Sequence, residues 1–273
     1  MEVTSTAEEL MFTTVRIETK DTIGKEWVAT GFLFNYKKQE NQYYTFLVTN
    51  KHVVKNKIEG TITFMKGKDK KPLLGRAIKV NIPDFANMWH VHPNLDIDVA
   101  VGSFTPILES MQKNMLIPYY RTVPSDLIPS EETWKEIDAI EEIIFIGYPS
   151  GIWDSKYFLP LTRMGITATH PTIDYEGKPQ FLIDASVFPG SSGSPVFLYD
   201  PRTRPGKVGI IPPRLFFLGI LASFIHYNEE NEVKTKTATK RKSVAYFTQI
   251  VDLGIVYKAK TILETIEDLL SKK

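Results

Sequence analysis

The sequence predicts an all-β fold of two six-stranded antiparallel β-barrels, followed by a C-terminal α-helix. Short runs rich in β-branched and aromatic residues recur between turn signals, which is typical of barrel strands. The runs fall into two series of six, separated by a polar, partly helical connector at residues 124–142. Near the end of the chain the apolar residues change to helical spacing, which predicts the helix. With 273 residues, 42% of them hydrophobic, the chain can bury such a core.

Each series of runs marks one predicted barrel. We expect the first barrel to span residues 1–122, the second to span residues 123–254 and the helix to occupy residues 255–273, all within one functional unit. The runs of the first series lie at residues 14–18, 30–34, 44–49, 61–65, 78–82 and 97–104. The runs of the second series lie at residues 143–147, 163–169, 180–185, 195–199, 215–224 and 244–250.

The last part of the chain contains two further segments with distinct patterns. The helix is predicted from apolar residues at helical spacing, namely Ile255, Ala259, Ile262, Leu263, Ile266, Leu269 and Leu270. The basic stretch KTKTATKRK at residues 234–242 has no apolar periodicity, so it is predicted to be a surface loop, with a recognition element as the alternative.

Composition excludes several classes of function. The 33 basic and 32 acidic residues give a formal net charge of +1, so no overall field favours nucleic acid or an anionic membrane. The absence of cysteine excludes a thiol nucleophile, thiolate metal sites and disulfides, and it favours a cytoplasmic location. The N-terminal segment lacks the pattern of a secretory signal. The longest apolar run, residues 215–225, is shorter than the roughly 20 residues that cross a bilayer.

Three segments carry the groups that acyl transfer by a serine requires: a hydroxyl, an imidazole, an orienting carboxylate and amide donors for an oxyanion. The segment FLVTNKHVV places His52 at the exit of an apolar strand. The segment LDIDVAV places Asp98 directly before a buried strand, and PGSSGSPVF places Ser192 in a glycine-flanked turn. Each segment alone is weak evidence, because glycine and serine mark ordinary turns.

The order and spacing of these residues strengthen the interpretation. The chain order His, Asp, Ser, with intervals of 46 and 94 residues, resembles that of the trypsin and chymotrypsin family. The nucleophile motif G-S-S-G-S-P departs from the family's G-D-S-G-G-P at two positions and keeps two glycines and the proline. Further similarity lies in the T-x-x-H-V turn, the D-V-A-V strand and the G-Y-P segment at 147–149. The chain is most similar to cysteine-free members, such as the high-temperature-requirement proteases and the bacterial trypsin-like peptidases.

This resemblance implies a chymotrypsin-like fold and a role for each residue of the site. His52 would be the general base, Asp98 the acid that orients it and Ser192 the nucleophile, with the backbone N–H groups of Gly190 and Ser192 forming the oxyanion hole. Asp96 is the alternative acid, because it lies two residues before Asp98 and shares its face of an extended segment. We favour Asp98, since it directly precedes the D-V-A-V strand.

The resemblance also bears on activation and specificity. Ser191 stands where secreted trypsins have the aspartate that pairs with a newly cleaved N-terminus, so activity is expected without such cleavage or under control by a partner. The substrate pocket is expected to have no acidic base and to favour small or medium apolar side chains. Its expected residues are Ser186, Phe188, Ala222, Ser223 and Phe224.

The predicted function is therefore that of a serine endopeptidase of narrow or partner-regulated specificity that needs no cofactor or metal. The expected partners are a protein or peptide substrate and a regulatory protein, with no nucleic acid and no membrane. The alternative function is that of a catalytically silent pseudoprotease, a peptide-binding or scaffolding module in which residues 234–242 or the C-terminal helix dock a partner. His90 and His92 could supply two metal ligands, but the sequence offers no third.

Overall fold

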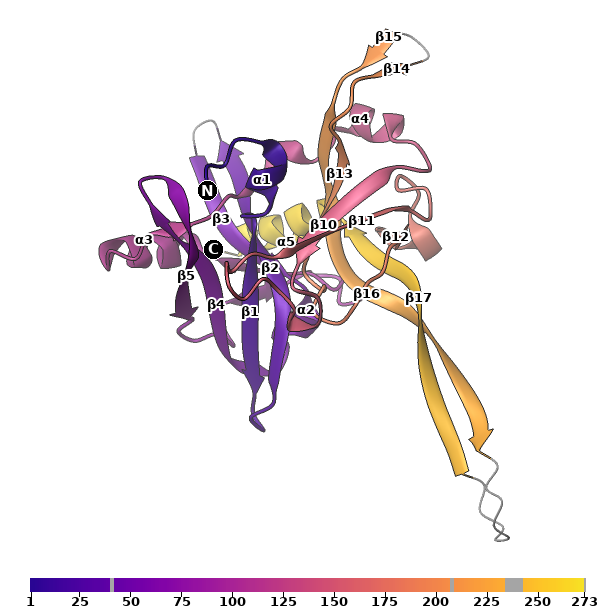
Figure 1. The fold of residues 1–273 in the computed structure, drawn as a ribbon, viewed down its shortest axis with the longest axis horizontal. Helices are drawn as coiled ribbons and strands as arrows, with labels where there is room; N and C mark the ends of the chain where they lie inside the picture. The colour runs from indigo at the N-terminus through magenta and orange to yellow at the C-terminus, as the bar shows by residue number, and fades with distance from the viewer. Residues whose placement is uncertain (40–41, 207–208, 234–242, 273) are drawn as a thin grey trace.

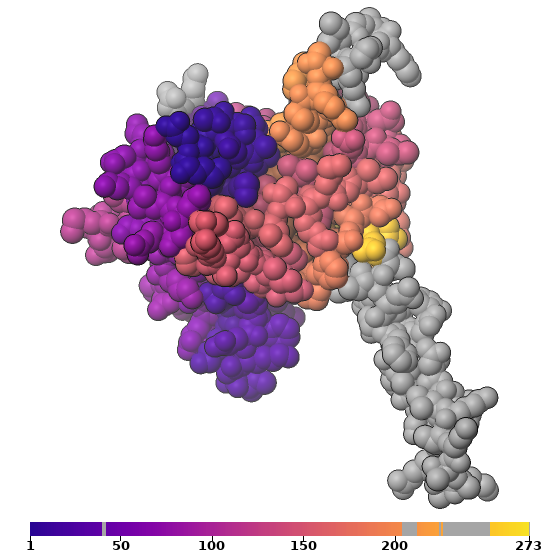
Figure 2. All heavy atoms as spheres, viewed as in Figure 1, coloured from indigo at the N-terminus to yellow at the C-terminus, as the bar shows by residue number. Residues whose placement is uncertain are grey.

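The computed structural model describes residues 1–39, 42–206, 209–233 and 243–272, and it confirms the all-β fold with a C-terminal helix (Figure 1). The predicted loop at residues 234–242 lies outside the described residues. Figure 2 shows the N-terminal half, in indigo and purple, packed against the pink and orange C-terminal half.

The N-terminal half is a sheet of nine strands in the order β5-β4-β1-β2-β3-β7-β6, with β8 paired to β4 and β9 paired to β2. Six of these strands coincide with the six predicted runs: β1 (Thr14–Asp21), β2 (Glu26–Gln39), β3 (Gln42–Thr49), β4 (Lys57–Lys68), β5 (Lys71–Asn81) and β7 (Ala100–Ser103). The other three have two or three residues each: β6 (Trp89–Val91), β8 (Pro118–Tyr119) and β9 (Val123–Pro124). Three helices belong to this half: α1 (Thr6–Leu10), α2 (Lys51–Val54) and α3 (Thr105–Lys113).

The C-terminal half is a closed antiparallel barrel in the order β10-β11-β12-β17-β16-β13, as the sequence predicts. Its strands are β10 (Glu142–Gly147), β11 (Leu161–Thr167), β12 (Gln180–Asp184), β13 (Pro195–Asp200), β16 (Arg214–Val233) and β17 (Ser243–Lys258). The chain enters the barrel through the 3-10 turn η1 (Ser125–Leu127) and helix α4 (Glu131–Glu136). Two further 3-10 turns follow strands β10 and β11, namely η2 (Pro149–Gly151) and η3 (Tyr175–Gly177).

Two hairpins extend from the barrel. A small two-stranded sheet of β14 (Arg204–Gly206) and β15 (Gly209–Ile211) lies beyond the end of β13 (Figure 1). Strands β16 and β17 continue past the barrel as a two-stranded ribbon that stays paired as far as Val233 and Ser243 (Figure 1).

The C-terminal helix α5 (Lys260–Ser271) begins later than the apolar spacing predicts. Ile255 pairs with Leu182 of β12 and with Ser223 of β16, so the first residues of the predicted helix belong to the barrel. The helical pattern was extended too far because an apolar residue inside a closed barrel cannot be told from one on a helix over a single turn. Ile262 and Ile266 are fully buried in the core cluster that α5 helps to close.

The two halves share an aromatic cluster. Phe32 and Phe34 of β2 lie with their ring centroids 5.4 and 6.1 Å from that of Phe217 of β16, and Phe197 of β13 packs on the other side of Phe217 at 5.6 Å. All four side chains are completely buried. Because fully buried aromatic residues dominate core energetics, this cluster fixes the position of the N-terminal sheet on the barrel. The junction between the halves is therefore a rigid base for a site.

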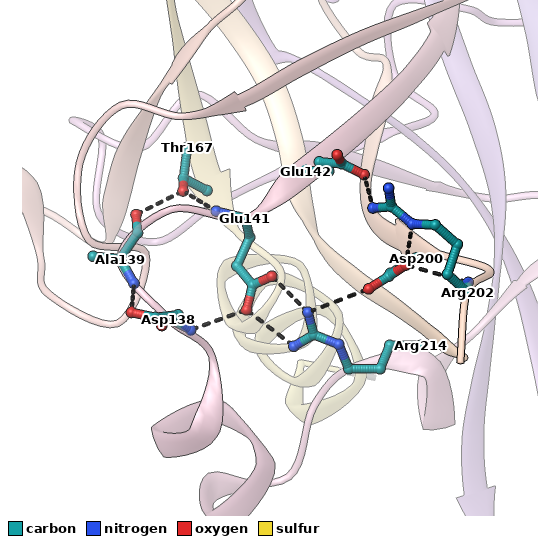
Figure 3. A network of polar contacts seen from close by, with 8 residues as sticks. All are labelled: Asp138, Ala139, Glu141, Glu142, Thr167, Asp200, Arg202 and Arg214. Carbon is teal, nitrogen blue, oxygen red and sulfur yellow. Dashed lines mark hydrogen bonds and ion pairs between the residues drawn. The ribbon is translucent and has the colours of Figure 1, made fainter. Parts of the chain in front are cut away.

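A buried ion pair joins the segment directly before β10 to the first residue of β16 (Figure 3). The guanidinium of Arg214 donates two hydrogen bonds to the carboxylate of Glu141, at 3.0 and 2.6 Å, and lies 3.9 Å from Asp200. The Glu141 carboxylate also accepts from the backbone N–H of Asp138. This bidentate geometry compensates for burial of the charges, since only 6% of the Glu141 side chain is exposed.

Candidate active site

His52 stands on the short helix α2, which begins where the buried strand β3 ends. Val53 and Val54 of this helix are buried, so the helix is anchored on one face and presents its histidine on the other. The His52 side chain is 51% exposed. The imidazole is thus held by a packed element and remains accessible to a ligand.

Asp98 holds the His52 imidazole from behind. One carboxylate oxygen lies 2.5 Å from His52 Nδ1, and the other accepts the backbone N–H of His52 at 2.9 Å. The side-chain amide of Asn50 donates to the Asp98 carbonyl oxygen at 2.8 Å, which ties the two segments together. Because a carboxylate only accepts hydrogen bonds, Nδ1 carries a ring hydrogen, and Nε2 is the basic nitrogen of the neutral imidazole. Asp98 therefore fixes the ring through Nδ1 and leaves Nε2 as the nitrogen that can accept a proton.

Asp96 has a structural place away from the imidazole. Its side chain is exposed, its backbone N–H binds Asn94 Oδ1, and its carbonyl oxygen accepts the Tyr257 hydroxyl at 3.0 Å. Burial raises the pKa of Tyr257, and the charge of Asp98 raises it further, so this hydroxyl remains a neutral donor. Asp98 is thus the acid that the structure brings to His52.

Ser192 lies on a tight turn that requires glycine. Gly190 and Gly193 have φ angles of 87° and 90°, in the region that residues with a side chain rarely adopt. A Cβ atom at Gly193 would lie 1.9 Å from the Thr30 carbonyl oxygen, so no other residue fits there. In this conformation the Ser192 hydroxyl donates to the Ala222 carbonyl oxygen at 2.8 Å, and its hydrogen is directed to β16 instead of to His52.

The same turn leaves two amide groups without an acceptor among the described residues. The Pro189 carbonyl accepts the N–H of Ser150, and the Ser191 carbonyl accepts the N–H of Ser194. Since trans peptides point C=O and N–H in opposite directions, the N–H groups of Gly190 and Ser192 point away from these anchors. Neither N–H has an acceptor in the part of the chain that the structure describes. Two unengaged donors next to a serine can stabilise an oxyanion.

Thr30 of β2, which no sequence motif marks, connects this turn to the N-terminal half. Its hydroxyl donates to the Gly190 carbonyl at 2.9 Å and accepts the Tyr148 N–H at 3.0 Å. Its backbone N–H donates to the Ser192 carbonyl at 3.1 Å. Thr30 is completely buried, so these bonds are shielded from water. A single threonine inside a strand gives no sequence signal for such a contact with the turn that carries Ser192.

A cavity of about 480 Å³ brings these groups together. It is lined by His52, Ser192 and Gly190, and by Ala222 and Ser223 among the predicted pocket residues. Ser186 and Phe188 are not part of its lining; the Phe188 ring is partly exposed and lies under the guanidinium of Arg163, 4.9 Å from its centroid. The side chain of Phe224 lies outside the described part of the chain. The remaining lining residues, which the sequence did not indicate, are Thr19, Trp27, Val28, Ala29, Val53, Lys57 and Pro189.

His90 and His92 each contact a carboxylate on α5. His90 Nε2 lies 2.7 Å from Asp268 and His92 Nε2 lies 2.9 Å from Glu264. The described residues contain no group of three His, Cys, Asp or Glu side chains that could hold a metal ion. The two histidines therefore attach α5 to the N-terminal sheet.

Comparison with known proteins identifies the family. The model of the trypsin-like peptidase domain matches residues 29–203, which include His52, Asp98 and Ser192. The chain belongs to this family of trypsin-like peptidase domains. No curated protein matches it.

A search of solved structures gives a protease, Anisep from Arthrobacter nicotinovorans, among the similar folds. The two chains are 9% identical with a TM-score of 0.47, and the match covers 93% of this chain and 94% of the other.

None of the helices in the described part of the chain has the length and hydropathy that a membrane span requires.

Proposed function

We propose that this protein is a serine endopeptidase that works through an acyl-enzyme. The observation that carries the proposal is the arrangement of His52 and Ser192 around one cavity, with His52 hydrogen-bonded to Asp98 and the unengaged amides of Gly190 and Ser192 beside the serine. These are the parts that acyl transfer by a serine requires, and they come from both halves of the fold.

The mechanism follows from the hydrogen-bond geometry. Rotation of the Ser192 side chain would move its hydrogen from the Ala222 carbonyl to Nε2 of His52, which then accepts the proton as Ser192 Oγ attacks the substrate carbonyl. Asp98 stabilises the imidazolium, and the amides of Gly190 and Ser192 stabilise the oxyanion. His52 then donates the proton to the leaving amine, and water attacks the acyl-enzyme by the reverse steps.

We further propose that the uncleaved chain is active. The Ser191 side chain is 1% exposed and its hydroxyl has no hydrogen-bond partner among the described residues, so no ion pair orders this turn. Thr30 and Ser150 hold the turn through its carbonyl groups instead. These bonds do not depend on a new N-terminus, which makes proteolytic activation unnecessary. Narrow specificity for small or medium apolar residues, or a regulatory partner, would then limit the activity.

One observation favours a second function, a pseudoprotease that binds peptides. The Ser192 hydroxyl donates to Ala222, and a serine fixed in that rotamer would not be activated by His52. The cavity would still hold a peptide in this case.

A peptide library separates the two functions. The purified protein is incubated with a peptide mixture, and new termini are identified by mass spectrometry for the wild type, Ser192→Ala and a control, Ser110→Ala, whose exposed serine lies on α3. An endopeptidase gives new internal termini with the wild type and Ser110→Ala but not with Ser192→Ala. Peptides retained without cleavage by the wild type and Ser192→Ala alike would instead identify a pseudoprotease.

A further inference from the structure

The side of the cavity formed by β2, α2 and β4 has a mainly apolar lining with one cation. We call it the β2 hollow; it is formed by Trp27, Val28 and Ala29 of β2, Val53 of α2 and Lys57 of β4. Trp27 is 45% exposed and Val53 is buried, so the walls are apolar and include one accessible aromatic ring. The hollow is thus continuous with the site of Ser192 and chemically different from it.

Lys57 is the cation of this hollow. Its side chain is only 10% exposed, and its ammonium group lies 4.5 Å from the Trp27 ring centroid. The ammonium of Lys25 lies 4.1 Å from the same centroid. Among the described residues that line the cavity, His52 and Lys57 are the ionisable ones and none is a carboxylate. A partly desolvated ammonium among apolar walls favours an anionic ligand.

The counter-charge of Lys57 is incomplete. Asp21 lies 3.9 Å from the Lys57 ammonium, but its other oxygen accepts the backbone N–H groups of Ile23 and Lys25, at 3.1 and 2.9 Å. Burial raises the pKa of Asp21, but these backbone bonds, a bond from Trp27 and the charge of Lys57 together lower it, so the group is ionised. Asp21 therefore pairs with Lys57 only at long range, and the ammonium of Lys25 adds a second positive charge next to Trp27.

The position of the β2 hollow indicates which side of the scissile bond it binds. The acyl half would lie along β16, where Ala222 and Ser223 line the cavity. The β2 hollow lies on the β2 and α2 side of the same cavity, next to His52, which donates its proton to the leaving amine. The residue that follows the scissile bond therefore enters the β2 hollow. Farther out, Glu18, Glu26, Glu59, Lys20 and Lys79 line an adjacent depression that shares Trp27 and would meet later residues.

We propose that Lys57 is a specificity-determining residue that selects substrates with aspartate or glutamate directly after the scissile bond. The carboxylate would pair with the Lys57 ammonium, and its methylene groups would pack on Trp27 and Val28. This inference rests on the proposed peptidase function, because it assumes an acyl-enzyme at Ser192.

Acyl transfer to added amines tests the leaving-group side directly. The enzyme is acylated with the fastest of a panel of N-acetyl amino acid p-nitrophenyl esters, and amino acid amides compete with water for the acyl group. The amine nitrogen bonds to the acyl carbon, the bond to Ser192 Oγ breaks, and the amine proton passes through His52 to Ser192 Oγ. The ratio of peptide to acid product measures how well each amide occupies the β2 hollow.

Glutamate amide and glutamine amide have side chains of similar size and differ in charge, so they are compared directly. Lysine amide carries the same charge as Lys57 and should be the poorest acceptor. We expect the wild type to use glutamate amide about three- to tenfold better than glutamine amide, the range of one partly screened ion pair. Lys57→Gln should abolish this ratio and Lys57→Glu should invert it in favour of lysine amide. The control Lys55→Gln, which changes an exposed lysine outside the cavity lining, should leave the ratio unchanged.

Failure of the peptidase function and failure of the role of Lys57 give different results. If no ester acylates Ser192, the peptidase function itself is refuted, and this inference is refuted with it. If the acyl-enzyme forms but glutamate, glutamine and lysine amides compete equally, or if Lys57→Glu keeps the preference for glutamate, only the role of Lys57 is refuted.

Discussion

Substitution of Thr30 by valine is a sharp perturbation of the turn that carries Ser192. Valine keeps the shape and the β-branch of threonine and replaces only the hydroxyl by a methyl group. The change leaves the Gly190 carbonyl and the Tyr148 N–H without the partners they have at 2.9 and 3.0 Å. Thr30 and Tyr148 are buried, so water cannot readily replace the bond to the Tyr148 N–H, whereas Gly190 is partly exposed at the cavity.

The expected loss in the free energy of unfolding follows from these two hydrogen bonds. A buried polar group without a partner costs about 1–3 kcal/mol, so Thr30→Val should lower the free energy of unfolding by about 2–5 kcal/mol. For a chain of this size that corresponds to a fall of about 5–15 °C in Tm. Loss of the bond to the Gly190 carbonyl should also let Gly190 turn and displace its own N–H, which is one of the two oxyanion donors. Complete loss of such a donor costs about 100- to 1000-fold in rate, so displacement should cost about 10- to 100-fold.

The assay compares the second-order rate constant of fluorophosphonate labelling with Tm, using Thr30→Ser as the control. Serine restores the hydroxyl, so its labelling rate should approach that of the wild type. A purely structural role would lower Tm and leave the labelling rate unchanged at temperatures well below Tm. If Thr30→Val reacts within about twofold of the wild type under these conditions, Thr30 does not position the oxyanion donors.

Three other predictions concern the triad, the barrel entrance and α5. Asp98→Asn should slow fluorophosphonate labelling by about 1000-fold or more, because an amide donor stabilises the wrong tautomer of His52; a rate near that of the wild type would contradict its role. Glu141→Gln should lower the free energy of unfolding in urea by about 2–4 kcal/mol, because Arg214 loses a buried charged partner. The control Glu142→Gln removes the charge from the exposed pair Glu142–Arg202 and should cost under about 1 kcal/mol. Equal losses in the two variants would refute the role of burial. Hydrogen bonds from Lys272 and His90 lower the pKa of Asp268, so its carboxylate stabilises the fold above its ordinary pKa of 3.8 and loses this effect as the pH falls through the lowered value. Asp268→Asn should therefore lower Tm at pH 7 and converge with the wild type below that window, and a Tm difference that persisted there would contradict the assignment.

Much of the architecture could be predicted because strand signals are local. All twelve predicted runs overlap strands of the structure, and runs such as 143–147 and 195–199 nearly match β10 and β13. The short strands β6, β8 and β9 were not predicted, since segments of two or three residues carry no periodicity. Helix α3 was also missed, because its partly polar sequence gives only one buried residue, Met111.

In the site, the residues that stand in local motifs could be predicted, and those that depend on contacts between distant segments could not. His52, Asp98 and Ser192 stand in recognisable motifs, and the structure places all three at one junction. Thr30, Trp27 and Lys57 belong to strands whose sequence looks structural, and Thr30 makes contacts with residues 160 or more positions away in the chain. Positions of this kind depend on how the halves pack, which a motif does not encode.

Labelling of the intact, uncleaved chain with a fluorophosphonate, followed by mass mapping of the adduct, tests the central claim most directly. The account predicts one adduct, located on Ser192, that is lost in Ser192→Ala and in His52→Ala. An unlabelled wild type, or an adduct that persists in His52→Ala, would show that His52 does not activate Ser192 and would contradict the account.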